Sequence, residues 1–197
     1  MAATLGVLLK NFPEHKERGE ATWLLPTAQQ AAGQFGKALK RFAAVPADSA
    51  KWEEARFRRA LCSRLACEAQ RGELAPAAFL ALARKSAATM REYSDAAFKR
   101  AGGKKKVLEW AAQAGVGAAE LLAARGVERF QDALNALADF ETRFPNSDLM
   151  GRVLAAQIKA HRGLNDFEKA SSLLKKYMAT VPQDQAGAVL MGLARGM

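Results

Sequence analysis

The sequence predicts an all-α fold, and three observations lead to that prediction. Residues that favour helices dominate the composition, with Ala supplying much of the apolar half and Leu, Arg, Lys, Glu and Gln much of the rest. No stretch alternates between apolar and polar residues in the sustained way that is typical of a half-buried strand. Almost every Pro and Gly falls between stretches with apolar residues at helical spacing, where helices are expected to end.

The C-terminal half of the chain repeats itself at an offset of 37 residues. When residues 115–145 are laid over residues 152–182, ten of the 31 positions are identical. Two of the identical positions are Gly126 with Gly163, each following an Arg, and Pro145 with Pro182. A helical hairpin cannot bury both of its faces alone, so such units are expected to stack on one another.

Each repeat unit is predicted to hold two helices. Gly126 and Gly163 are expected to end the first helix, because Gly adopts the left-handed conformation of a C-cap at no steric cost. The second helix carries apolar residues at steps of three and four, namely Phe130, Ala133, Leu137, Phe140 and Phe144 in one unit and Phe167, Ala170, Leu174, Tyr177 and Val181 in the next. Pro145 and Pro182 cannot continue a helix and end each unit.

This second helix resembles that of a tetratricopeptide repeat. The shared pattern is a small residue, an apolar residue four later, an aromatic three after that, and Pro after five more. It is found here in Ala133, Leu137, Phe140 and Pro145, and again in Ala170, Leu174, Tyr177 and Pro182. The family period is 34 rather than 37, and Leu121 and Ile158 stand where the family has Gly. The resemblance implies a right-handed α-solenoid of antiparallel helix hairpins.

Gly and Pro are placed in the same way toward both ends of the chain and divide it into units. We expect a single helical-repeat domain of nine to ten helices, with a half unit over 1–13, units over 14–46, 47–101, 102–145 and 146–182, and a half unit over 183–197. The two half units predict that the chain is a fragment of a longer repeat protein, with apolar ends that self-associate or are covered in the parent. The alternative is that the last helix is itself a cap.

The net charge of +10 lies in the middle of the chain. Residues 37–106 hold 17 Lys and Arg against 7 Asp and Glu, and the rest of the chain is neutral. A set of cations surrounds Gly102-Gly103, namely Lys99, Arg100, Lys104, Lys105 and Lys106. Clustered cations neutralise phosphates, so this set is a candidate anion-binding site. The alternative is a helix end whose cations are placed favourably against the helix dipole, and no aromatic residue is interleaved for base stacking.

A second candidate site is a stripe on the helix that begins near residue 49. Its residues share a narrow arc and are Trp52, Arg56, Arg59, Ser63 and Gln70. In tetratricopeptide-like arrays the first helix of each unit lines a concave groove that often accepts acidic peptide termini, so the resemblance implies a ligand here. Arg suits carboxylate capture because its planar fork donates two hydrogen bonds at once. The alternative is a solvated edge with Arg stems covering apolar surface.

The sequence offers no constellation for catalysis. No nucleophile, base and orienting acid can be assembled, and neither His15 nor His161 has a ligand cluster around it. We therefore predict no enzyme, no metal and no cofactor. Cys62 and Cys67, five apart on one helix, point to different sides and are predicted to be small buried residues rather than a disulfide. No apolar run is long enough to cross a bilayer.

These observations predict a protein–protein interaction or scaffolding module that binds an acidic peptide in a concave groove. One alternative is binding of nucleic acid or an anionic surface through residues 37–106. Another is a structural spacer within a larger repeat protein. The chain has no apparent targeting segment, which favours the cytoplasm by default and the periplasm if the chain is cut from a secreted parent.

Overall fold

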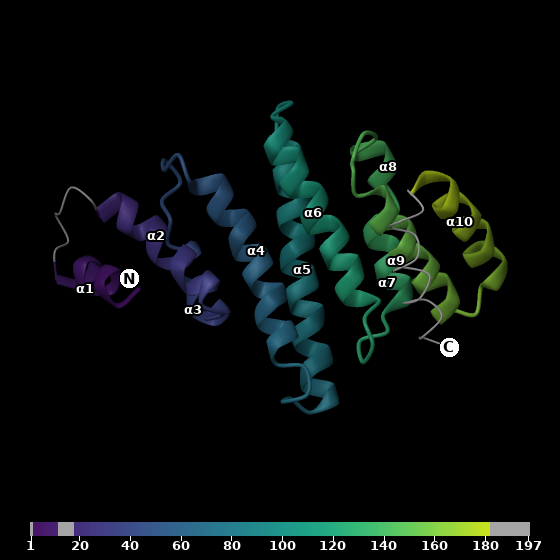
Figure 1. Cartoon of the computed structure of the whole chain (residues 1–197), viewed down its shortest axis with the longest axis horizontal. Helices are drawn as coiled ribbons and strands as arrows, with labels where there is room; N and C mark the ends of the chain where they lie inside the picture. Colours follow the sequence, from purple (N-terminus) through teal and green to yellow (C-terminus); the bar gives the residue numbers. More distant parts are fainter. Residues whose placement is uncertain (1, 12–17, 182–197) are drawn as a thin grey trace.

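The computed structural model describes residues 2–11 and 18–181, and every regular element in these ranges is a helix (Figure 1). The helices are α1 (Ala2–Asn11), α2 (Arg18–Ala31), α3 (Phe35–Phe42), α4 (Trp52–Ala69), α5 (Pro76–Arg100), α6 (Lys105–Leu122), α7 (Phe130–Leu137), α8 (Phe140–Arg143), α9 (Met150–Gly163) and α10 (Phe167–Thr180). The all-α prediction is therefore confirmed for the described part of the chain. The expected half unit over 183–197 lies outside the described residues, as do Phe12, Pro13 and His15.

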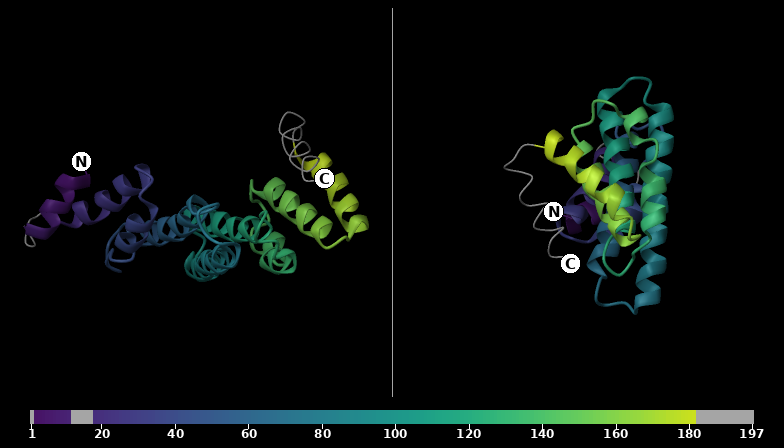
Figure 2. Two further views of the ribbon diagram at one scale, coloured as in Figure 1. Left: turned by 90° about the horizontal axis from the view of Figure 1, so that it is seen from below. Right: turned by 90° about the vertical axis from the view of Figure 1, so that its right-hand side faces the viewer.

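Successive helices lie side by side in an elongated row that runs from α1 at one end to α10 at the other (Figures 1 and 2). Helices α2 with α3, α4 with α5, α6 with α7, and α9 with α10 pack as neighbouring pairs. The first members of these pairs also meet, since α4 contacts α6 and α6 contacts α9. None of the described helices is both long and apolar enough to cross a membrane.

The apolar core is spread along this row in three clusters. The largest joins α4 to α9 through α5, α6, α7 and α8. A second joins α2 and α3 to α4, and a third joins α9 to α10. Helix α4 belongs to two clusters, because the buried thiol of Cys62 faces α3 and that of Cys67 faces the central cluster. Neither thiol forms a disulfide bond.

Small residues let α5 and α6 approach each other closely at the centre of the row. Residues 114–119 of α6 are all buried. A Cβ added at Gly115 would lie 3.1 Å from Oγ of Ser94, and one at Gly117 would lie 2.5 Å from Cε of Met90. Both contacting side chains come from α5. The absence of side chains at these two glycines therefore allows α5, the longest described helix, to pack this closely against α6.

Six of the ten inner residues predicted for the second helices of the two similar units are buried, and Phe130 and Val181 are only half-buried. Ala133, Leu137, Phe140, Phe144, Ala170 and Tyr177 are buried. Leu174 is only half-buried, and Phe167 is 63% exposed. Phe167 begins the last described helix, and none of the described helices packs beyond it.

The helix expected to run from Phe130 to Phe144 is two helices. Helix α7 ends at Leu137, and α8 covers only Phe140–Arg143. The side chain of Arg143 contacts α5, where it donates from Nη1 to Asp95 at 2.7 Å and from Nη2 to the carbonyl of Ser94 at 3.2 Å. Asp139, between the helices, leaves helical geometry with φ −107° and ψ 11°, yet Phe140 and Phe144 remain buried.

Gly126 and Gly163 lie at the turns of the two units, and glycine is suited to each position for a different physical reason. Gly126 has φ 79°, the left-handed conformation that was predicted, but α6 already ends at Leu122, so Gly126 lies in the turn and does not cap the helix. Gly163 does not have a left-handed backbone; it is the last residue of α9, and a Cβ there would overlap the ring of Phe130. The left-handed residue of this turn is instead Asn165, with φ 61°. The expected role of Gly163 as a left-handed cap is therefore wrong, and the residue is needed for a close contact between neighbouring hairpins.

Candidate functional site

Trp52 begins α4 and is flanked by two guanidinium groups. The central carbon of the Arg56 guanidinium lies 4.8 Å from the centre of the indole, and that of Arg100 lies 5.2 Å from it. Arg100 comes from the last turn of α5 and also donates from Nη2 to Glu53 at 3.1 Å. Contacts of this kind are favourable because the cation faces the negative face of the ring. The structure thus brings together members of both predicted sets, which lie far apart in the sequence.

Arg56 has unused hydrogen-bonding capacity. Its Nε is buried and has no hydrogen-bond acceptor, and the guanidinium forms no ion pair with any described residue. Arg59, one turn further along α4, is exposed and likewise forms no ion pair within the described ranges. Tyr93 is a buried residue of α5 that interacts with the charges of Arg56 and Arg100. Its pKa is raised above the ordinary value by burial and further by the carboxylate of Glu53. We call Trp52, Arg56, Arg59 and Arg100 the Trp52 surface.

The other two residues of the predicted stripe do not join this surface. Ser63 is buried, donates from Oγ to Oγ of Ser86 at 3.2 Å, and accepts at its carbonyl from the Ser86 hydroxyl at 3.0 Å. Gln70 follows the end of α4, about 27 Å along the helix axis from Trp52 at the usual rise per residue. A ligand on the Trp52 surface therefore touches neither of them.

The stripe also faces a different neighbour from the one expected. Trp52 and Ser63 both meet α5, the second helix of the same pair. The side of α4 that faces other first helices carries Arg58, which donates to Gln30 of α2, and Arg64, which donates to Glu120 of α6. The stripe therefore lies beside the second helix and does not line the side where α2, α4, α6 and α9 follow one another.

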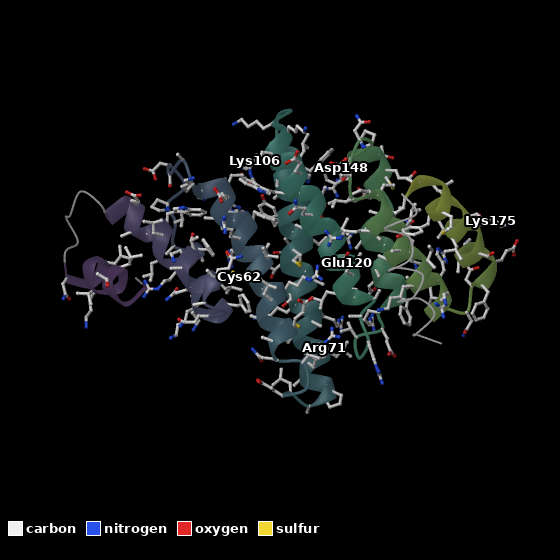
Figure 3. All side chains as sticks on the ribbon, in the orientation of Figure 1. Cys62, Arg71, Lys106, Glu120, Asp148 and Lys175 are labelled. Atoms are coloured by element: carbon white, nitrogen blue, oxygen red, sulfur yellow. The ribbon has the colours of Figure 1, made fainter. Side chains whose placement is uncertain are left out.

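The basic set around Gly102-Gly103 is exposed and has aromatic neighbours that the sequence did not indicate. Lys99, Lys104, Lys105 and Lys106 are exposed at this end of α5 and α6, where Figure 3 labels Lys106. The Lys106 ammonium lies 5.2 Å from the ring centre of Trp110, and Phe57 stacks on the same indole with centroids 5.5 Å apart. Protein groups thus already contact the faces of both Trp52 and Trp110.

Sequence reasoning missed an ionic cluster at the centre of the row, where Figure 3 labels Glu120. The Glu120 carboxylate accepts from Nη1 of Arg64 at 2.9 Å and from Nε and Nη2 of Arg152 at 2.8 and 2.7 Å. Burial opposes the charge on Glu120, but these donors outweigh it and hold its pKa below the ordinary value. The available signal was a lone acid in the small, apolar stretch 111–124. With its charges paired, this cluster joins α4, α6 and α9 rather than offering a free binding group.

His161 and Asp166 lie at the turn between α9 and α10. Nδ1 of His161 lies 3.1 Å from Oδ2 of Asp166, which caps α10 by accepting from the backbone N–H of Lys169 at 3.3 Å. Within the described ranges, no three His, Cys, Asp or Glu side chains gather into a possible metal site.

No family model matches the chain, and no curated protein matches it significantly in sequence.

Proposed function

We propose that this chain is a scaffold of stacked helical hairpins, similar in build to a tetratricopeptide solenoid, that binds an acidic peptide segment at the Trp52 surface. The repeated backbone supports this build. Glu128 and Asn165, 37 residues apart, both have left-handed backbones, with φ 51° and 61°. Phe130 and Phe167, separated by the same offset, both begin a second helix.

The observation that carries the binding proposal is the state of Arg56. Its neighbours Arg58, Arg64 and Arg100 all form ion pairs with carboxylates of the chain, whereas Arg56 has none among the described residues. Contact with Trp52 holds the guanidinium in place, so less side-chain freedom is lost when a ligand binds. A carboxylate from a partner would accept from Nη1 and Nη2 of Arg56 in a bidentate geometry, because Nε is buried and stays out of the contact. The exposed Arg59 would take a second acidic group.

The same geometry disfavours nucleic acid as the ligand. Sequence-independent binding of single strands relies on aromatic faces that are open to the bases. Here Arg56 and Arg100 lie over Trp52, and Phe57 and Lys106 lie over Trp110. Carboxylate binding uses the edges of the guanidinium groups and needs no open ring.

The test is direct binding of a fluorescein-labelled Glu-rich peptide, measured by fluorescence anisotropy on the whole chain. Arg56→Glu with Arg59→Glu is expected to abolish binding, because two attractive charges become repulsive. Lys104→Glu with Lys105→Glu makes the same change in net charge at side chains that do not contact the Trp52 ring, and is expected to weaken binding only slightly. Circular dichroism of both variants checks that the helices are retained.

Three outcomes would contradict the proposal. Loss of binding in the lysine variant alone would move the site to the loop around Gly102-Gly103. Tighter binding of a single-stranded oligonucleotide of equal charge, with affinity falling steeply as salt rises, would favour the nucleic-acid alternative. If the wild-type chain binds neither probe, the spacer alternative is favoured.

A further inference from the structure

A pocket of about 200 Å³ opens between α5, α6 and α7. Arg84 and Arg91 of α5 form one wall, and Asp132 and Asn135 of α7 form the other. The floor is apolar and consists of the buried Ala87, Ala118 and Leu122, and the exposed Ala88 lines the pocket nearer the solvent. The pocket is separate from the Trp52 surface, because it lies on the side of α5 that faces α7, whereas Trp52 meets α5 through Arg100.

The charged groups of the pocket are unequally satisfied. Asp132 accepts from Nε of Arg129 at 2.8 Å, so its charge is already paired. Arg84 and Arg91 are exposed and form no ion pair with the described residues, unlike Arg100 on the same helix. They are seven residues apart, which places them on the same side of α5 with Cα atoms about 10 Å from each other. The pocket therefore offers two separate cationic forks over a hydrocarbon floor.

The volume limits what this pocket accepts. Sites for drug-sized ligands usually enclose roughly 300–1,000 Å³, so a nucleotide or a larger cofactor exceeds the space between these helices. Two forks at this separation suit two carboxylates better than one oxyanion, since each guanidinium can bind one carboxylate in a bidentate manner. Three alanine methyl groups and Leu122 would contact the hydrocarbon between them.

We propose that this pocket binds a small dicarboxylate through Arg84 and Arg91. The same chemistry is presented by a free dicarboxylic acid and by two acidic side chains of a protein segment. In either case the Asn135 amide lies on the opposite wall, where it can hydrogen bond to the ligand. The proposal goes beyond peptide binding at the Trp52 surface, and either one can fail without the other.

The test is nuclear magnetic resonance of the full chain with labelled Ala and Leu methyl groups, titrated with glutarate. Saturable shifts are expected at Ala87, Ala118 and Leu122, since these methyl groups form the floor. Arg84→Ala and Arg91→Ala are each expected to weaken glutarate binding about three- to tenfold, the effect of removing one partly exposed charged contact. Butyrate, with one carboxylate, is expected to bind more weakly than glutarate.

Lys85→Ala is the matched control, because it removes one positive charge from the exposed residue next to Arg84 outside the pocket. If this variant weakens glutarate as much as Arg84→Ala does, the attraction is general and the proposal is overturned. Absence of saturable methyl shifts with both glutarate and the Glu-rich peptide would also overturn it. Methyl shifts that appear with the Glu-rich peptide but not with glutarate, and that are lost in the Arg84→Ala and Arg91→Ala variants, support the site. They would identify a protein segment as the source of the carboxylates.

Discussion

Arg152 donates two parallel hydrogen bonds to Glu120, from Nε to Oε1 at 2.8 Å and from Nη2 to Oε2 at 2.7 Å. This bidentate contact joins α9 to α6, and the bond from Arg64 at 2.9 Å extends it to α4. Charge-assisted bonds of this geometry are among the stronger polar contacts in proteins. The cluster is partly open to solvent, however, since the Arg152 side chain is 47% exposed.

Glu120→Gln is expected to lower the free energy of unfolding at pH 7 by about 1–2 kcal/mol, a value reduced for the exposure of Arg152. The pKa of Glu120 is depressed in the folded protein. Its contribution is therefore present above the unfolded pKa of about 4.3 and is lost as pH falls through the lower folded pKa. Urea denaturation at pH 7, 5 and 3 should show the two proteins converging in acid. Glu109→Gln, an exposed acid on the same helix, is the control; an equal loss there would contradict the prediction.

Gly163→Ala is expected to destabilise the protein by about 1–3 kcal/mol, as overpacking of a well-packed contact usually does. The added methyl group would overlap the ring of Phe130. In a helix without that contact, Gly→Ala is favourable by up to about 1 kcal/mol. Gly36→Ala in α3, where a Cβ meets nothing within 4 Å, provides this comparison. Thermal denaturation of both variants should give shifts of opposite sign, and combining Gly163→Ala with Phe130→Leu should recover part of the loss.

Leu137→Ala should cost about 2–5 kcal/mol, because it removes a large side chain from a packed site. Leu137 is only 2% exposed and belongs to the central cluster. Leu174→Ala should cost less, about 1–2 kcal/mol, because its half-buried side chain loses fewer contacts. Urea denaturation measures both values. Equal costs would mean that Leu174 is as fully covered as its counterpart in the preceding unit.

The stability of the protein should fall as pH rises from about 9 to 11. Burial raises the pKa of the Cys62 thiol to about 11, with Arg58 acting in the opposite direction. In that window the unfolded thiol loses its proton while the folded thiol keeps it, so the unfolded state gains about 1–3 kcal/mol relative to the folded state. Cys62→Ala should make this dependence less steep in denaturant titrations at pH 8, 9.5 and 11, while Cys67 and Tyr93, whose pKa values are also raised by burial, still contribute. Parallel curves for wild type and variant would show that Cys62 makes no such contribution.

The spacing of apolar residues anticipated the all-α fold because it acts within a few residues of chain. Gly and Pro were weaker signals, since Pro26 lies inside α2 and Gly115 and Gly117 lie inside α6. Local sequence patterns did not anticipate the break between α7 and α8, since it accompanies the contacts of Arg143 with Ser94 and Asp95 on α5. They also did not anticipate why glycine is needed at position 163, because the ring that leaves no room for a side chain there belongs to Phe130 of the preceding hairpin.

The candidate site shows the same limit. Helical spacing correctly placed Trp52 and Arg56 on one arc, yet it gave no information on which helix covers that arc. Burial of Ser63 follows from α5, whose Ser86 sits against it. The contact of Arg100 with Trp52 spans 48 positions, and the bond of Arg64 with Glu120 spans 56. No periodicity within one helix encodes a partner at that separation.

The distribution of the core over three clusters has a consequence for how the molecule opens. Because α4 and α9 each belong to two clusters, each keeps its packing in the largest cluster when a smaller cluster is lost. The α9–α10 cluster is small, so α10 can detach without disturbing α5 and α6, whose facing residues are in the largest cluster. Amide protons should accordingly exchange with solvent first in α10 and last in the middle of the row, so that denaturation proceeds inward as fraying rather than as a single event.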